Sequence, residues 1–162
     1  MSENRLPAEV ETGESHYPEW RGLLLAELAL ARVPELLVHK EPPHATPGFR
    51  YDFLVATPDG FCFFVEVEAF SSTELRLKEV ESSDELRWKI DAPSIRLAKR
   101  SRSPVVLFLF DADTDHGRYL RLDTLPTSAA KARNTVKLPA TNTINPTNLR
   151  RLVSELRDKI AS

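Results

Sequence analysis

Cysteine is nearly absent from this chain of 162 residues, which contains only Cys62. A single cysteine cannot form an internal disulfide, and a four-ligand zinc site would have to draw on the four histidines. Those histidines do not show the spacing typical of metal ligands. The composition therefore excludes a disulfide-stabilised scaffold and gives no support for a zinc site.

Long hydrophobic runs are absent as well. The longest apolar stretch, residues 23–31, is interrupted by Glu27 and is much shorter than the roughly 20 residues that cross a bilayer. The first 18 residues are polar and lack the basic start and apolar stretch of a secretion signal. We therefore expect no membrane association and a cytoplasmic location.

Neither glycine nor net charge indicates a partner. The five glycines form no phosphate-binding loop, and the G-x-S-x-G motif is missing. A net charge of -2 is too small for a strongly basic nucleic-acid-binding protein, although a local basic patch is compatible with it. The length and the 41% hydrophobic content predict one core. We expect a flexible N-terminal arm over residues 1–17 and a single α/β domain over residues 18–162.

The apolar patterns predict alternating helices and strands. The helix expected over residues 20–32 is apolar on nearly every side, which favours packing on more than one face. We expect further helices from Ser83 or Asp84 to residue 90, from Pro93 to about residue 99, and, with an amphipathic stripe, over residues 145–160. Strands are expected over residues 36–39, 49–56, 61–70, 103–111 (buried on both faces), 118–122 and 136–139 (an edge strand).

The clearest local signal is a hairpin turn at residues 57–61, Thr-Pro-Asp-Gly-Phe. Proline and aspartate fit a type I turn, and Gly60 fits the left-handed position that follows it. Such a connection pairs Thr57 with Phe61. Continuing this register along a regular antiparallel ladder places Asp52 directly across from Glu66.

Carboxylates gather on one face of this hairpin. Alternation along a strand puts Glu68 on the same face as Glu66. Like charges in such positions repel, and a partly buried carboxylate is costly unless it is neutralised. A divalent cation with oxygen ligands is the most economical explanation; a protonated pair, a partner arginine or plain solvation of the acids are the alternatives. Flanking aromatic residues favour a site over a solvated face.

At these residues the sequence resembles the PD-(D/E)XK nuclease superfamily, in particular a bacterial branch of small stand-alone domains. The resemblance covers about residues 20–125 and implies a restriction-endonuclease-like core, with a mixed β-sheet flanked by helices. It also implies a catalytic set of Glu27 on the first helix, Asp52 on the first hairpin strand, and Glu66 and Glu68 on the second. Mg²⁺ or Mn²⁺ would be held by Asp52, Glu66 and the carbonyl of Val67.

The sequence departs from this family at Glu68, which stands where the motif lysine is expected. Some active members carry Glu there, and in others the lysine has moved to the next helix, where we expect Lys89 and Lys99. The role of Glu68 as a ligand, a general base or a lost lysine stays open.

The resemblance predicts a metal-dependent nuclease-like domain that hydrolyses DNA phosphodiesters, in bacterial defence or mobile-element biology. The alternative is a catalytically inactive relative that serves as a nucleic-acid or protein binding module. DNA is the expected partner of an active enzyme, and a homodimer or a partner protein is left open. The basic stretch at residues 96–102 either contacts phosphates or is a solvated helix end.

Overall fold

A computed structural model of the chain describes residues 17–40, 51–73, 85–126 and 134–161. The expected N-terminal arm lies outside these ranges up to residue 16. The elements, in chain order, are α1 (Tyr17–Ala31), β1 (Leu37–Lys40), β2 (Phe53–Ala56), β3 (Cys62–Phe70), β4 (Glu85–Ile90), α2 (Ala92–Arg100), β5 (Val105–Asp111), β6 (Gly117–Arg121), β7 (Asn134–Pro139) and α3 (Pro146–Ala161), with short 3₁₀ turns at Leu122–Thr124 and Ala140–Asn142.

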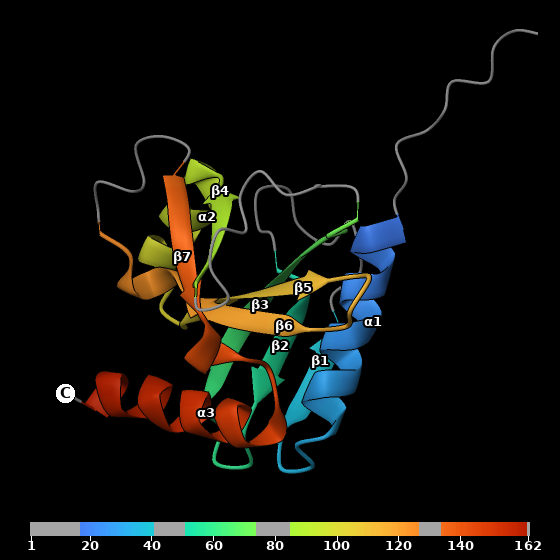
Figure 1. Ribbon diagram of the computed structural model, residues 1–162. Helices are drawn as coiled ribbons and strands as arrows, with labels where there is room; N and C mark the ends of the chain where they lie inside the picture. Colours follow the sequence, from blue (N-terminus) through green and yellow to red (C-terminus); the bar gives the residue numbers. More distant parts are fainter. Residues whose placement is uncertain (1–16, 41–50, 74–84, 127–133, 162) are drawn as a thin grey trace, which may run out of the picture.

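Five strands form one mixed sheet in the order β1-β2-β3-β5-β6 (Figure 1). The β3–β5 pair is parallel, and the other neighbours are antiparallel. β4 and β7 form a separate antiparallel pair. The expected α/β fold with a mixed sheet is thus confirmed. No helix in the described ranges is long and apolar enough to cross a membrane.

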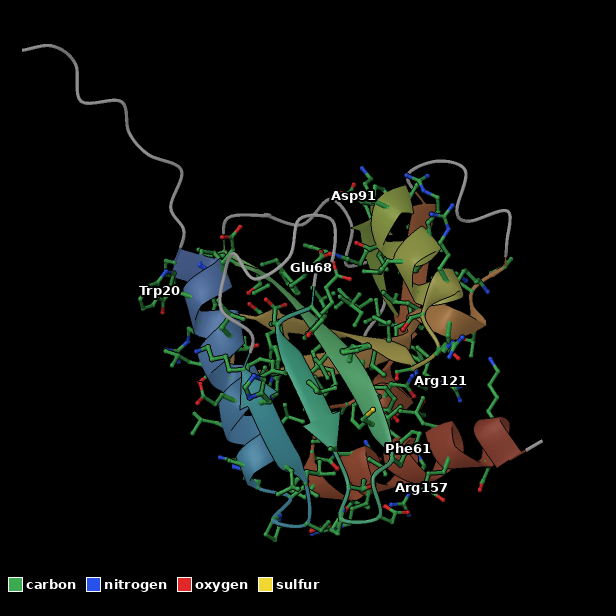
Figure 2. All side chains as sticks on the ribbon, turned by 180° about the vertical axis from the view of Figure 1, so that it is seen from behind. Trp20, Phe61, Glu68, Asp91, Arg121 and Arg157 are labelled. Carbon is green, nitrogen blue, oxygen red and sulfur yellow. The ribbon has the colours of Figure 1, made fainter. Side chains whose placement is uncertain are left out.

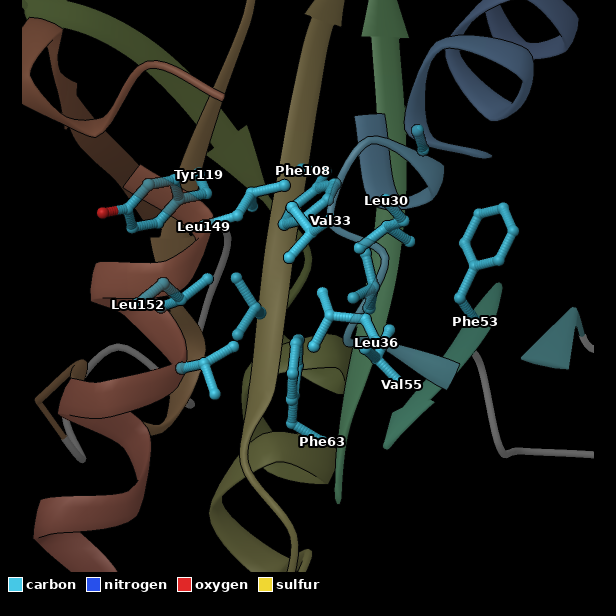
Figure 3. Close-up of a cluster of buried hydrophobic side chains, with 14 of the residues drawn as sticks. Leu30, Val33, Leu36, Phe53, Val55, Phe63, Phe108, Tyr119, Leu149 and Leu152 are labelled. Carbon is cyan, nitrogen blue, oxygen red and sulfur yellow. The ribbon is translucent and has the colours of Figure 1, made fainter. Parts of the chain in front are cut away.

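The two faces of the sheet pack against different layers. On one face Phe63 and Val65 of β3 lie in a core shared with α1 and α3 (Figure 3). On the other face β5 packs against α2 and against the β4–β7 pair through a second core. The apolar run of β5 is continuous because this strand supplies buried residues to both cores, as expected for a strand buried on both faces.

One expected helix is wrong. Residues 85–90 form strand β4 and not the end of a helix capped by Ser83 or Asp84, which lie outside the described residues. Leu86, Trp88 and Ile90 belong to the second core or pack against it, while Arg87 and Lys89, which alternate with them, are exposed. This alternation is a strand pattern, and pairing with β7 satisfies the backbone.

Helix α1 packs by one side only within the described residues, contrary to the expected packing on several faces. Gly22 lies so close to β3 that an added Cβ would be 2.7 Å from the Cβ of Ala69. The opposite side exposes four large apolar side chains: Tyr17, Trp20, Leu24 and Leu28. The sheet covers one side of the helix, and Figure 2 shows Trp20 pointing away from the domain.

The C-terminal amphipathic helix is confirmed as α3. Leu149, Leu152, Val153 and Leu156 are all buried, as the predicted stripe requires. This helix packs in the same core as α1 and covers buried residues of β2, β3 and β5.

Candidate carboxylate site

The predicted hairpin turn is present. The Thr57 amide N donates to the Phe61 carbonyl O at 2.8 Å, and Gly60 has a φ of 85°. The cross-strand pairs run from Ala56–Cys62 to Phe53–Val65, which is the register predicted from the turn.

Counted back from the turn, the regular ladder ends at Phe53. Asp52 therefore does not form the expected pair with Glu66. The Asp52 amide N donates to the Val65 carbonyl O at 2.8 Å, and β2 begins only at Phe53. The Asp52 carboxylate turns toward β3, where Oδ2 accepts from the Val67 amide N at 2.6 Å. This side chain therefore takes the place of the strand partner that the backbone no longer supplies to Val67.

Glu66 and Glu68 both contact the α2 and β4 layer. The Ser94 hydroxyl of α2 donates to Glu66 Oε1 at 2.9 Å. The Trp88 indole N of β4 donates to Glu68 Oε2. Both glutamates are half-buried and lie on one side of β3, as alternation predicted. The two elements that follow the hairpin thus fix the two acids by hydrogen bonds.

Burial is the main cause of the raised pKa values of Asp52 and Glu68. Burial raises the pKa of Glu68 above its ordinary value of 4.5; the Trp88 bond opposes this shift, and the negative charges of Asp91 and Asp52 add to it. Burial also raises the pKa of Asp52 above 3.8, against the opposing effects of the Val67 amide and the charge of Lys40. The site therefore holds two partly desolvated carboxylates, and the charge of Asp52 adds to the forces that disfavour ionisation of Glu68.

Asp52→Asn should stabilise the metal-free protein at neutral pH, by about 1 kcal/mol. Because the folded-state pKa of Asp52 is raised, the folded chain retains a proton that the unfolded chain releases, and stability falls as pH rises from 3.8 through the folded pKa. Asparagine does not ionise, so the variant does not lose stability over this pH range. Its side-chain oxygen can still accept from the Val67 amide. Urea unfolding with a chelator should show the gain at pH 7 and little gain below pH 3.8. An equal gain at both pH values would contradict the proposed cause.

Glu27 of α1 forms a salt bridge with Lys40 of β1. Its Oε2 is 3.4 Å from the Nζ of Lys40, and both side chains are about half exposed. The same Lys40 charge lowers the pKa of Asp52. The structure thus links Glu27 to Asp52 through a lysine of β1 and shows no direct contact between the two acids in the described residues.

The sequence left open whether Lys89 or Lys99 takes the place of the motif lysine. Lys89 is on strand β4, not on a helix, and it lies on the exposed side of that strand. Lys99 is on α2, as expected, but its Nζ donates to the Asp123 carbonyl O at 2.9 Å. The cation that acts on Asp52 is instead Lys40.

Four residues of this site escaped the sequence analysis: Lys40, Trp88, Asp91 and Ser94. Ser94 and Trp88 act through their hydrogen bonds to the acids, whereas Lys40 and Asp91 act through charge. The alternation of apolar and basic residues in 86–90 is the sequence signal that identifies β4 and turns Trp88 inward. For Lys40, which ends a short edge strand, we find no such signal.

A divalent ion fits this site only with few protein ligands. The described ranges contain no group of three or more His, Cys, Asp or Glu side chains arranged to hold a metal ion. Mg²⁺ commonly takes one or two carboxylates and fills its other positions with water and phosphate oxygens. Asp52 and Glu68 each use one carboxylate oxygen for the hydrogen bonds described above, which leaves a second oxygen on each as a potential ligand.

Comparison with known proteins does not assign this chain to a family, because neither the family models searched nor the curated proteins searched give a match.

Proposed function

We propose that this chain is a divalent-metal-dependent nuclease-like domain that hydrolyses DNA phosphodiesters. The observation that carries the proposal is that two half-buried carboxylates, Asp52 before β2 and Glu68 on β3, are near enough for the charge of Asp52 to raise the pKa of Glu68, and that each accepts a hydrogen bond from the protein. Their repulsion and desolvation disfavour the metal-free ionised state. A cation between them offsets both costs.

The chain's own residues have distinct roles in this proposal. Asp52 and Glu68 hold Mg²⁺ or Mn²⁺. Glu66 lies on the same side of β3, where it either contacts the water or serves as a further ligand of the ion. The bound ion supplies activation of water and stabilisation of charge on the phosphate. The Val67 amide and the Trp88 indole orient the two ligands. Lys40 keeps Asp52 closer to its ionised form, which is the form that binds a cation.

The order of elements supports the resemblance to the PD-(D/E)XK nucleases. A helix, an antiparallel three-strand unit, a second helix and a parallel strand follow one another as α1, β1–β3, α2 and β5. β4 is inserted between β3 and α2. This insertion brings Trp88 to Glu68, at the position where the family pattern has lysine.

A non-catalytic binding module is the second candidate. The observation that favours it is that Asp52, Glu66 and Glu68 all already accept hydrogen bonds from the protein itself. Acids retained only for packing would be satisfied in this way without a metal ion.

Cleavage of circular duplex DNA separates the two candidates. With Mg²⁺ or Mn²⁺ the wild type should nick or linearise a plasmid, and a chelator should stop the reaction. Asp52→Asn should reduce the rate at least about 100-fold, equivalent to ~2.7 kcal/mol, because a ligand is lost. Asp115→Asn, the same change at an exposed acid paired with Arg21, is the matched control and should cleave normally. A wild type without metal-dependent cleavage, or full activity in Asp52→Asn, would refute the nuclease.

A further inference from the structure

The β4–β7 pair presents a basic outer face. Arg87 of β4 lies directly across from Lys137 of β7, and Lys89 lies across from Thr135. All four side chains are exposed. This face therefore offers a polyanion exposed cations from both strands of the pair.

The surrounding sequence strengthens the positive field. Residues 85–102 hold six Lys or Arg against two Asp or Glu, in a chain whose net charge is -2. Beyond the strand itself, the additional basic residues are on α2 and just after it: Arg96, Lys99, Arg100 and Arg102. Asp91, between β4 and α2, is the exposed acid in this region. Residues 85–102 are therefore a basic segment of a nearly neutral chain, with its cations on β4, on α2 and just after it.

The inner face of the same pair is anchored beside the carboxylate site. Ile90, Val136 and Leu138 are buried in the second core, and the Trp88 indole donates to Glu68. Figure 2 shows Glu68 on β3 and Asp91 at the start of α2, in the same upper part of the domain. A molecule bound to the outer face of β4 and β7 thus lies on the strand whose Trp88 contacts Glu68, a proposed ligand of the metal ion.

We propose that the outer face of the β4–β7 pair docks into the major groove of duplex DNA through Arg87, Lys89 and Lys137. The B-form major groove admits a two-stranded β-ribbon, whereas the deep, narrow major groove of duplex RNA does not. The inference rests on the proposed function for its choice of DNA, and it adds the surface that positions this substrate.

Arg87→Glu tests this surface because it changes binding and stability in opposite directions. A short labelled DNA duplex is titrated with protein in a chelator, so that no cleavage occurs, at two or more salt concentrations. Arg87→Glu should weaken binding at least about tenfold and reduce the slope of log affinity against log salt by about 1, the value for one phosphate contact. Its melting temperature should equal or exceed that of the wild type, because Glu at position 87 faces Lys137.

Arg32→Glu is the control, since it makes the same charge change at an exposed position just after α1. It should leave the affinity within about twofold of wild type. Unchanged binding in Arg87→Glu, or equal losses in both variants, would overturn the proposed surface. Equal affinity for an RNA duplex of the same sequence, or stronger binding to vesicles of anionic lipid, would also overturn it.

The outcome is separable from that of the nuclease proposal. Asp52→Asn should bind the duplex as well as the wild type does in the chelator, although it does not cleave. Arg87-dependent binding without any cleavage by the wild type would retain this surface and refute the nuclease. If Arg87→Glu changes neither DNA binding nor metal-dependent cleavage, the nuclease is retained and this surface is refuted.

Discussion

Mg²⁺ or Mn²⁺ is expected to raise the melting temperature of the wild-type protein by about 5–10 °C at a concentration 100 times the dissociation constant. A ligand at that concentration stabilises the folded state by about 2.7 kcal/mol, and 1 kcal/mol shifts the midpoint of a domain of this size by about 2–4 °C. The physical reason is that the ion neutralises Asp52 and Glu68, whose charged forms are disfavoured by burial.

Asp52→Asn should show little of this shift, even though it starts from a higher melting temperature without metal. Differential scanning fluorimetry with and without the ion measures both effects on the same sample. Asp115→Asn serves again as the control, and Asn suits the positive φ of 63° at that position. Equal metal-induced shifts in the wild type and in Asp52→Asn would remove the ion from this site.

Glu68→Gln is expected to lower metal-dependent cleavage at least about 100-fold, or ~2.7 kcal/mol of transition-state stabilisation. Glutamine keeps the length of the side chain and an oxygen that accepts from Trp88, so the change removes charge and leaves the packing in place. Glu155→Gln on α3, an exposed acid near Arg151, is the matched control and should leave the rate unchanged.

Glu68→Lys distinguishes a working acid from a lost lysine. The change introduces the residue that the PD-(D/E)XK motif carries at the corresponding position, and a cation beside Asp52 and Asp91 replaces repulsion by attraction. An active site should retain measurable cleavage in this variant and lose it in Glu68→Gln. A non-catalytic domain should show no cleavage in any form, and its stability should reflect two opposing changes: the repulsion from Asp52 and Asp91 is removed, and the Trp88 indole loses its acceptor. Cleavage equal in Glu68→Gln and wild type would show that Glu68 has no role in the reaction.

The hairpin was predictable because its register depends on local turn chemistry. Proline, aspartate and glycine at 58–60 fix the turn, and the ladder from Phe53 to Ala56 follows from it. The prediction stopped being accurate at Asp52, where the carboxylate replaces a strand partner on Val67. A regular ladder extrapolated from the turn contains no signal for that departure.

The rest of the site depends on tertiary contacts, and the alternation of apolar and basic residues in β4 is the one local signal for any of them. β4 was mistaken for a helix because a window of six residues with polar neighbours is short for deciding between the two periodicities. With β4 misassigned, the contact between Trp88 and Glu68 was not foreseeable. Lys40 acts on Asp52 because β1 pairs with β2, and this pairing joins segments separated by residues 41–50.

The most direct test of the carboxylate site is the broadening of tryptophan indole NMR signals by substoichiometric Mn²⁺. The chain has two tryptophans: Trp88 donates to the proposed ligand Glu68, and Trp20 is 72% exposed on the outer side of α1. Paramagnetic broadening falls steeply with distance, so the Trp88 indole signal should disappear first in the wild type and persist in Asp52→Asn. Loss of both signals together, or loss of the Trp88 signal in Asp52→Asn at the same Mn²⁺ concentration, would contradict a metal ion held by Asp52 and Glu68.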